Sequence, residues 1–118
     1  MKVLLVDDSA TMRRIQKTQL MGLGVSEVIE AGNGEEAVAT LSASMPVDMV
    51  MMDWNMPVMD GFTCLKALRA DQRFKDVKII MCTSESEKSK VIDALKAGAN
   101  NYLVKPFTPE ALKEQLGL

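Results

Sequence analysis

Residues 49–57 read MVMMDWNMP, and this stretch decides the fold class. Its first four residues form an apolar run with no polar alternation, which predicts a strand buried on both faces of a sheet. Asp53 is the first residue after the run that can meet water, and it stands beside Trp54, the only tryptophan in the chain. Strands of this kind are typical of parallel sheets covered by helices on both faces.

Similar short runs recur along the chain and alternate with segments of helical periodicity. We expect five strands, at residues 2–6, 28–31, 49–52, 77–82 and 101–104. Five helical segments separate or follow them. The apolar positions that mark the first helix are Met12, Ile15, Leu20 and Leu23. Asn33 and Thr108 are the expected N-caps of the second and fifth helices. The strict alternation predicts an α/β fold, a doubly wound parallel sheet with helices on both faces.

Composition restricts the kinds of function that the chain can have. Its 118 residues fit one domain, and 47% hydrophobic residues can build a core. The net charge of −2 gives no basic stripe for nucleic acid, and Arg13, Arg14 and Lys17 form the only notable basic cluster, which we interpret as a solvated helix face. The absence of histidine excludes the usual zinc sites, serine triads and histidine phosphocarriers. Cys64 and Cys82 lie in apolar runs, which predicts buried free thiols.

The N-terminus and the apolar segments give no sign of export or membrane insertion. The opening MKVLLVDD has only four apolar residues between its lysine and two acids, too few for a signal peptide. No apolar run approaches the length that spans a bilayer. We therefore expect a cytoplasmic protein without a membrane or nucleic-acid partner.

Polar residues follow four of the five expected strands. Asp7 and Asp8 follow the first, Asp53 the third, Thr83 and Ser84 the fourth, and Lys105 and Pro106 the fifth. Any one of these is equally well explained as an ordinary turn residue. Because ligands bind at the carboxyl ends of the strands in open parallel sheets, the four together indicate a functional site.

The charges of these residues suggest the chemistry of the site. Asp7, Asp8 and Asp53 would place three carboxylates close together, and Lys105 offsets only one of them. A divalent cation neutralises the remainder, and ligands that are all oxygen favour Mg²⁺. An aspartate beside such an ion can attack phosphorus and form an aspartyl phosphate. Phosphoryl transfer needs mainly positioning and charge neutralisation, which Mg²⁺, Lys105 and the Thr83 hydroxyl would supply.

Several motifs are similar to those of one known family. They are VDDS at 6–9, TMRRI at 11–15, DWNMP and MDG within 53–61, TSE at 83–85, and NYLVKPF at 101–107. With these motifs the chain resembles the receiver domain of two-component response regulators over essentially its whole length. The resemblance implies a flavodoxin-like five-stranded sheet of order 2-1-3-4-5 with five helices. It also implies a single receiver domain over residues 1–118, without an output domain.

The resemblance further implies roles at the site. Asp53 would accept a phosphoryl group from a histidine kinase. Asp8 and the backbone carbonyl of Asn55 would bind Mg²⁺ directly beside Asp53, with Asp7 acting through water. Lys105 would hold phosphoryl oxygens, and the bond between it and Pro106 would be cis.

A switch and a partner surface are also implied. Thr83 would hold phosphoryl oxygens together with the lysine, and Tyr102 would report their movement. The face of the fourth helix, fifth strand and fifth helix, around Lys88, Val91 and Tyr102, would bind a target protein such as a flagellar motor switch component. The resemblance thus indicates a monomeric chemotaxis or motility switch that catalyses only its own phosphorylation and dephosphorylation, with a phosphatase as a further possible partner.

Three alternatives stay open at this point. A single-domain phosphorelay receiver could act on a partner outside motility. A phosphatase with an aspartyl nucleophile would share much of the site, but such enzymes usually carry a second acid two residues later, where this chain has Asn55. The stretch GNGEEA at 32–37 fits a dinucleotide-binding fingerprint, although it follows the second strand instead of the first.

Overall fold

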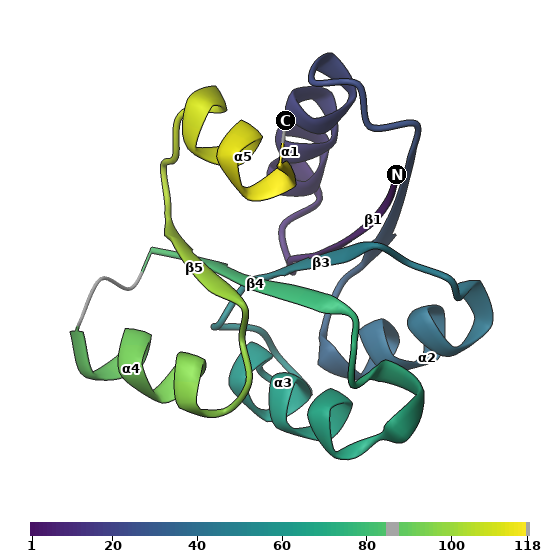
Figure 1. Cartoon of the computed structure of the whole chain (residues 1–118), viewed down its shortest axis with the longest axis vertical. Coiled ribbons are helices and arrows are strands. Elements are labelled where there is room, and N and C mark those ends of the chain that lie inside the picture. Colours follow the sequence, from purple (N-terminus) through teal and green to yellow (C-terminus); the bar gives the residue numbers. More distant parts are fainter. Residues whose placement is uncertain (85–87, 118) are drawn as a thin grey trace.

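A five-stranded parallel sheet of order β2-β1-β3-β4-β5 forms the centre of the computed structural model, which describes residues 1–84 and 88–117 (Figure 1). The strands are β1 Lys2–Val6, β2 Glu27–Ala31, β3 Met49–Met52, β4 Lys78–Thr83 and β5 Asn101–Val104. The predicted fold class and strand order are confirmed. The fourth strand is shifted by one residue from the expected 77–82, so Thr83 is its last residue and not the first residue beyond it.

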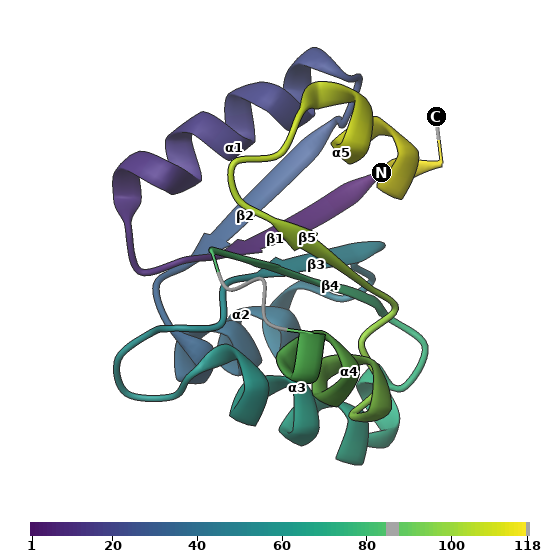
Figure 2. The ribbon, with the colours of Figure 1, turned by 90° about the vertical axis from the view of Figure 1, so that its left-hand side faces the viewer.

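Helices cover both faces of the sheet. Along the chain they are α1 Ala10–Gly22, α2 Gly34–Ser44, α3 Gly61–Ala70, the short 3₁₀ helix η1 Gln72–Phe74, α4 Lys88–Lys96 and α5 Pro109–Leu116. α1 and α5 lie on one face, and α2, α3 and α4 lie on the other (Figures 1 and 2). Within the described residues, none of these helices is both long enough and apolar enough to cross a membrane.

Side-chain caps fix where the helices begin. Asn33 accepts a hydrogen bond from the backbone N–H of Glu36 at 2.9 Å, and Thr108 accepts one from Ala111 at 3.1 Å. Both predicted N-caps are confirmed. Asp60 caps α3 in the same way through Thr63, at 2.7 Å. A cap of this kind stabilises a helix by about 1 kcal/mol.

The apolar strand residues divide between two cores. In β3, Met49 and Met51 face α1 and α5, whereas Val50 and Met52 face the other helices. All four residues are at most 1% exposed, as expected for a strand buried on both faces. Cys64 and Cys82 are buried free thiols, as predicted, and burial raises the pKa of each to about 12.

The first helix differs from its expected orientation. The sequence placed Ile15 on the buried face, yet Ile15 is 47% exposed and the next residue, Gln16, is 3% exposed. Gln16 and Leu20, four residues apart, form the face that meets the sheet. Hydrophobicity alone assigned the wrong residue to the core. Which side chains of α1 face the sheet depends on the rotation of the helix about its axis.

The loop between Asp53 and α3 contains a strained residue that gives a first prediction. Val58 has φ of 69°, a left-handed conformation unfavourable for a β-branched side chain, and its side chain is 76% exposed. Val58→Asn should therefore raise the free energy of unfolding by about 1 kcal/mol, because asparagine tolerates this conformation and no packing is lost. Urea denaturation measures the change. Val104→Asn, at an exposed position on β5, is the control and should lower stability; equal effects of the two changes would contradict the strain argument.

Candidate functional site

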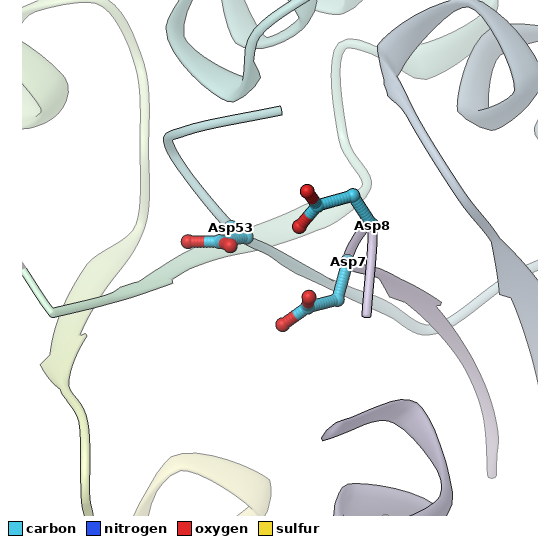
Figure 3. Close-up of side chains that lie close together, drawn as sticks. All are labelled: Asp7, Asp8 and Asp53. Atoms are coloured by element: carbon cyan, nitrogen blue, oxygen red, sulfur yellow. The ribbon is translucent and has the colours of Figure 1, made fainter. Parts of the chain in front are cut away.

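The acids at the ends of β1 and β3 are held in place by the sheet. The backbone N–H of Asp7 donates to the carbonyl of Ala31 at 3.1 Å, and that of Asp53 donates to the carbonyl of Val6 at 2.9 Å. Each acid therefore continues the hydrogen-bonding pattern of its strand by one residue. Oxygens of Asp7, Asp8 and Asp53 lie within 4.8 Å of one another, close enough to share a metal ion (Figure 3).

Lys105 reaches this cluster from the end of β5. Its backbone N–H donates to the carbonyl of Thr83 at 2.8 Å, which ties the ends of β4 and β5 together. Its Nζ lies 2.6 Å from Oδ2 of Asp7 and 3.7 Å from Oδ2 of Asp53. The lysine is therefore hydrogen-bonded to Asp7 and forms a longer ion pair with Asp53. The expected cis bond between Lys105 and Pro106 is present.

Asp7 is fixed on all sides. Its side chain is only 3% exposed, and its Oδ1 accepts from the backbone N–H of Ser9 at 2.9 Å. The guanidinium of Arg13 donates to the Asp7 carbonyl at 2.5 Å and pairs with Glu30 at 3.0 Å. Arg13 thus supports the site. The interpretation of its basic cluster as a solvated helix face missed this role. Its ion pair with an acid on the neighbouring strand was not visible in the sequence.

The surroundings of Asp53 raise its pKa above the ordinary aspartate value. Burial raises the pKa of Asp53, and the charges of Asp7 and Asp8 raise it further. Lys105 and the backbone N–H of Trp54, which donates to Oδ1 at 2.8 Å, act in the opposite direction. The net result is a raised pKa, so the carboxylate is short of positive charge. A cation bound among the three acids would supply it.

Two glycines allow close packing around Asp53. A Cβ on Gly61 would lie 1.9 Å from the carbonyl oxygen of Asp53, and a Cβ on Gly34 would lie 2.8 Å from the carbonyl oxygen of Met59. Backbone N–H groups of the same glycines donate to Trp54 at 2.8 Å and to Met59 at 3.0 Å. Gly34 belongs to the GNGEEA stretch, so this glycine of the motif allows the start of α2 to pack closely against Met59 and Cys64.

Trp54 is the centre of an aromatic column. Its ring stacks on Phe62 of α3 with centroids 4.8 Å apart and an interplanar angle of 5°. Lys66 lies over the outer face of Phe62 at 4.6 Å, and Lys90 of α4 lies over Trp54 at 5.5 Å. The column connects the residue after Asp53 to α3 and α4, and nothing in the spacing of these residues along the sequence pointed to it.

The remaining predicted residues lie around this centre. Thr83 is fully buried at the end of β4, beside the cluster, and Asn55 is exposed in the loop after Asp53. Tyr102 is half-buried against the core and pairs in register with Met81 of β4. Lys88 is exposed on α4 and Val91 is half-buried. Glu85 of the TSE motif lies outside the described residues.

Comparison with known proteins gives a consistent result at the level of sequence. The family model for the response regulator receiver domain matches residues 3–117. Chemotaxis protein CheY1 of Helicobacter pylori is 55% identical over 116 residues, covering 98% of this chain and 94% of that protein. A CheY homolog of Campylobacter jejuni is 53% identical and covers 98% and 89% of the two chains.

Solved structures of CheY proteins are also similar to this chain. CheY4 of Vibrio cholerae superposes with a TM-score of 0.89 at 40% identity, covering 98% of this chain and 95% of that one. CheY in a complex of CheX, CheY, BeF₃ and Mg²⁺ from Borrelia burgdorferi gives 0.92 at 31% identity, covering 98% and 86%.

Proposed function

This chain belongs to the response regulator receiver family and is a CheY-like chemotaxis signalling protein rather than a classical enzyme, and from this we propose that Asp53 is its phosphorylated residue. One observation carries the proposal. The Asp53 carboxylate ends a rigid buried strand, 3.7 Å from the ammonium of Lys105 and beside two further acids. A histidine kinase is the proposed phosphodonor in the cytoplasm.

The reaction would be a displacement at phosphorus. An Asp53 carboxylate oxygen forms the new bond, and the bond to the donor's leaving group breaks, with the electron pair departing on that group. Lys105 neutralises charge on the phosphoryl oxygens, and the Thr83 hydroxyl donates a hydrogen bond to one of them. Lys105 needs only a short movement, because its ammonium already lies between Asp7 and Asp53.

The three acids fit a divalent cation. Asp7, Asp8 and Asp53 offer oxygens within 4.8 Å of one another, and hard oxygen ligands are those that Mg²⁺ prefers. We propose that these acids and the backbone carbonyl of Asn55 hold Mg²⁺, which would neutralise phosphoryl charge when bound. The solved complex of a relative that contains BeF₃ and Mg²⁺ supports this choice.

The proposed output surface lies on α4, β5 and α5. Three large apolar residues are exposed there, Ile92 at 40%, Leu95 at 46% and Val104 at 40%. We propose that this face, with Lys88, Val91 and Tyr102, binds a target such as a flagellar motor switch component, with the receiver acting as a monomer. A relative that forms a complex with CheX supports the existence of further protein partners, and we propose that a phosphatase is one of them.

Direct mapping of the modified residue tests the phosphorylation proposal. The chain is incubated with acetyl phosphate and Mg²⁺, the acyl phosphate is reduced with borohydride, and the products are mapped by peptide mass spectrometry. We expect one modification, at Asp53, and none when Mg²⁺ is chelated. Modification at another acid, or none at all, would contradict the assignment.

Mg²⁺ binding should stabilise the folded chain. At a hundredfold excess over its dissociation constant, the ion should add about 2.7 kcal/mol to the free energy of unfolding if it binds only the native state. It should also quench the emission of Trp54, whose backbone N–H is bonded to Asp53. Urea denaturation and fluorescence titration measure both effects. Asp8→Asn should weaken both, and equal responses in that variant and wild type would remove Asp8 from the site.

The proposed link from Thr83 to Tyr102 can be tested with a label at the only tyrosine. With 3-fluorotyrosine at position 102, beryllofluoride and Mg²⁺ should shift the ¹⁹F resonance as the ring moves inward. Thr83→Ala should still bind beryllofluoride, at least about tenfold more weakly because one charge-assisted hydrogen bond is lost. It should also lose most of the shift. The same ¹⁹F shift in both proteins at saturation would disprove the mechanism without affecting the assignment of Asp53.

A further inference from the structure

Gln16 is a buried polar side chain that the phosphorylation site does not use. It is 3% exposed on the inner face of α1, and its Nε2 has no hydrogen-bond acceptor among the residues that the structure describes. A buried N–H₂ without an acceptor is destabilising, and proteins usually satisfy such a group with water or a ligand. A water molecule or a bound ligand would supply the acceptor that the described residues do not.

A pocket of about 80 Å³ adjoins Gln16. Met12, Ile15 and Gln16 of α1 line one side, and Lys105, Pro106 and Phe107, which follow β5, line the other. Since one water needs about 10–15 Å³ of such a volume, the pocket has room for several waters or one small organic molecule. The walls are mainly apolar with a few polar groups, as in sites for small molecules.

The chemistry of the walls favours an organic ligand over water. A bound water needs about two to four polar partners, whereas the pocket offers chiefly hydrocarbon from Met12, Ile15, Pro106 and Phe107. An anion is disfavoured because the ammonium of Lys105 is bonded to Asp7 at 2.6 Å. Gln16 Nε2 is buried in the structure, and because the terminal torsion of a glutamine is broad, it would meet an acceptor in the pocket once that torsion turns.

We propose that this pocket binds a small neutral molecule with a short hydrocarbon body and one acceptor oxygen, which accepts a hydrogen bond from Gln16 Nε2. Because Lys105 forms part of the wall, occupancy also affects the position of the lysine at the phosphorylation site. That second statement rests on the proposed function. The proposal of the binding site itself does not depend on the proposed function.

The probe for the test is 2-butanone, followed by ¹H–¹⁵N NMR of the whole chain. We expect saturable shifts of the Gln16 side-chain amide and the Phe107 backbone amide. Gln16→Leu, which keeps the bulk but removes the donor, should weaken binding at least about fivefold. Gln19→Leu, a control at the other glutamine of the wall, should change it less than twofold. Ile15→Trp, at a position that tolerates a large side chain because it is 47% exposed, should fill the pocket and abolish binding.

Two results would overturn the site: the absence of a saturable shift in wild type, or equal affinity in wild type and Gln16→Leu. The effect on Lys105 has a separate measurement. Saturating 2-butanone should change the rate of phosphorylation by acetyl phosphate at least twofold in wild type and leave Ile15→Trp unaffected. An unchanged rate with binding demonstrated would overturn only the effect on Lys105. If wild type is never phosphorylated, the proposed function fails and the NMR result still decides the binding site.

Discussion

Asp53→Asn should abolish Mg²⁺-dependent phosphorylation, with a loss of at least about a thousandfold in rate, because an amide oxygen cannot replace the carboxylate as nucleophile. Intact-protein mass spectrometry after incubation with acetyl phosphate measures the adduct. Asp60→Asn is the matched control. Asp60 caps α3 from an exposed position, and asparagine caps equally well, so this variant should be phosphorylated at the wild-type rate. An adduct on Asp53→Asn that forms as fast as on wild type would place the nucleophile elsewhere.

The same substitution should raise the melting temperature when Mg²⁺ is absent. Burial and two neighbouring acids raise the pKa of Asp53, so the native state disfavours its charged form. Between the ordinary aspartate pKa and the raised value, the native protein holds a proton that the unfolded chain has lost. This group's contribution to stability is therefore greatest at low pH and declines as the pH rises through that interval. Asp53→Asn should remove this part of the pH dependence, which thermal denaturation in a pH series detects.

Gly61→Ala should strongly destabilise the fold. The new methyl group would lie 1.9 Å from the carbonyl oxygen of Asp53, an impossible distance, and 3.0 Å from the Met81 side chain. Because the atom that must move belongs to the backbone, we expect a loss of about 3 kcal/mol or more. This corresponds to a fall in melting temperature of roughly 10 °C for a domain of this size.

Gly22→Ala is the control for that experiment. Gly22 is the last residue of α1, a Cβ there would meet nothing within 4 Å, and alanine favours helix more strongly than glycine. The control should be neutral or slightly stabilising. Phosphorylation of Gly61→Ala should also be slower, since the displaced carbonyl belongs to the nucleophile. Equal melting temperatures of the two variants would show that the loop moves aside freely.

The architecture and the centre of the site were predictable for a physical reason. In a parallel sheet the carboxyl ends of the strands share one edge, so Asp7, Asp53, Thr83 and Lys105 had to gather once the strands were assigned correctly. The predicted strands differed from the observed ones by a single residue at β2 and β4. This part of the structure depends on short local patterns, which the sequence carries directly.

Contacts between distant segments were not predictable in this way. Arg69 donates to the carbonyls of Gly98 and Phe74 and to the side chain of Asn100, and so joins η1 to the loop between α4 and β5. Ordinary helix periodicity gives no sign of such a contact. The prediction that Ile15, and not Gln16, is buried failed for the same reason. The rotation of a helix about its axis depends on everything that packs against it.

The ion pair between Lys105 and Asp7 limits how strongly the switch can respond. Lys105 already has an acidic partner, Asp7, at 2.6 Å. When the lysine turns to a phosphoryl group on Asp53, the free energy gained is only the difference between the new contact and the contact with Asp7. A small difference moves a conformational equilibrium only part of the way, and couplings of this type are typically about 1–3 kcal/mol. The unmodified receiver should consequently spend a measurable share of its time, on the order of 1%, in its signalling form. A target protein at high local concentration would then bind it without any phosphorylation, which gives the signalling pathway a basal output.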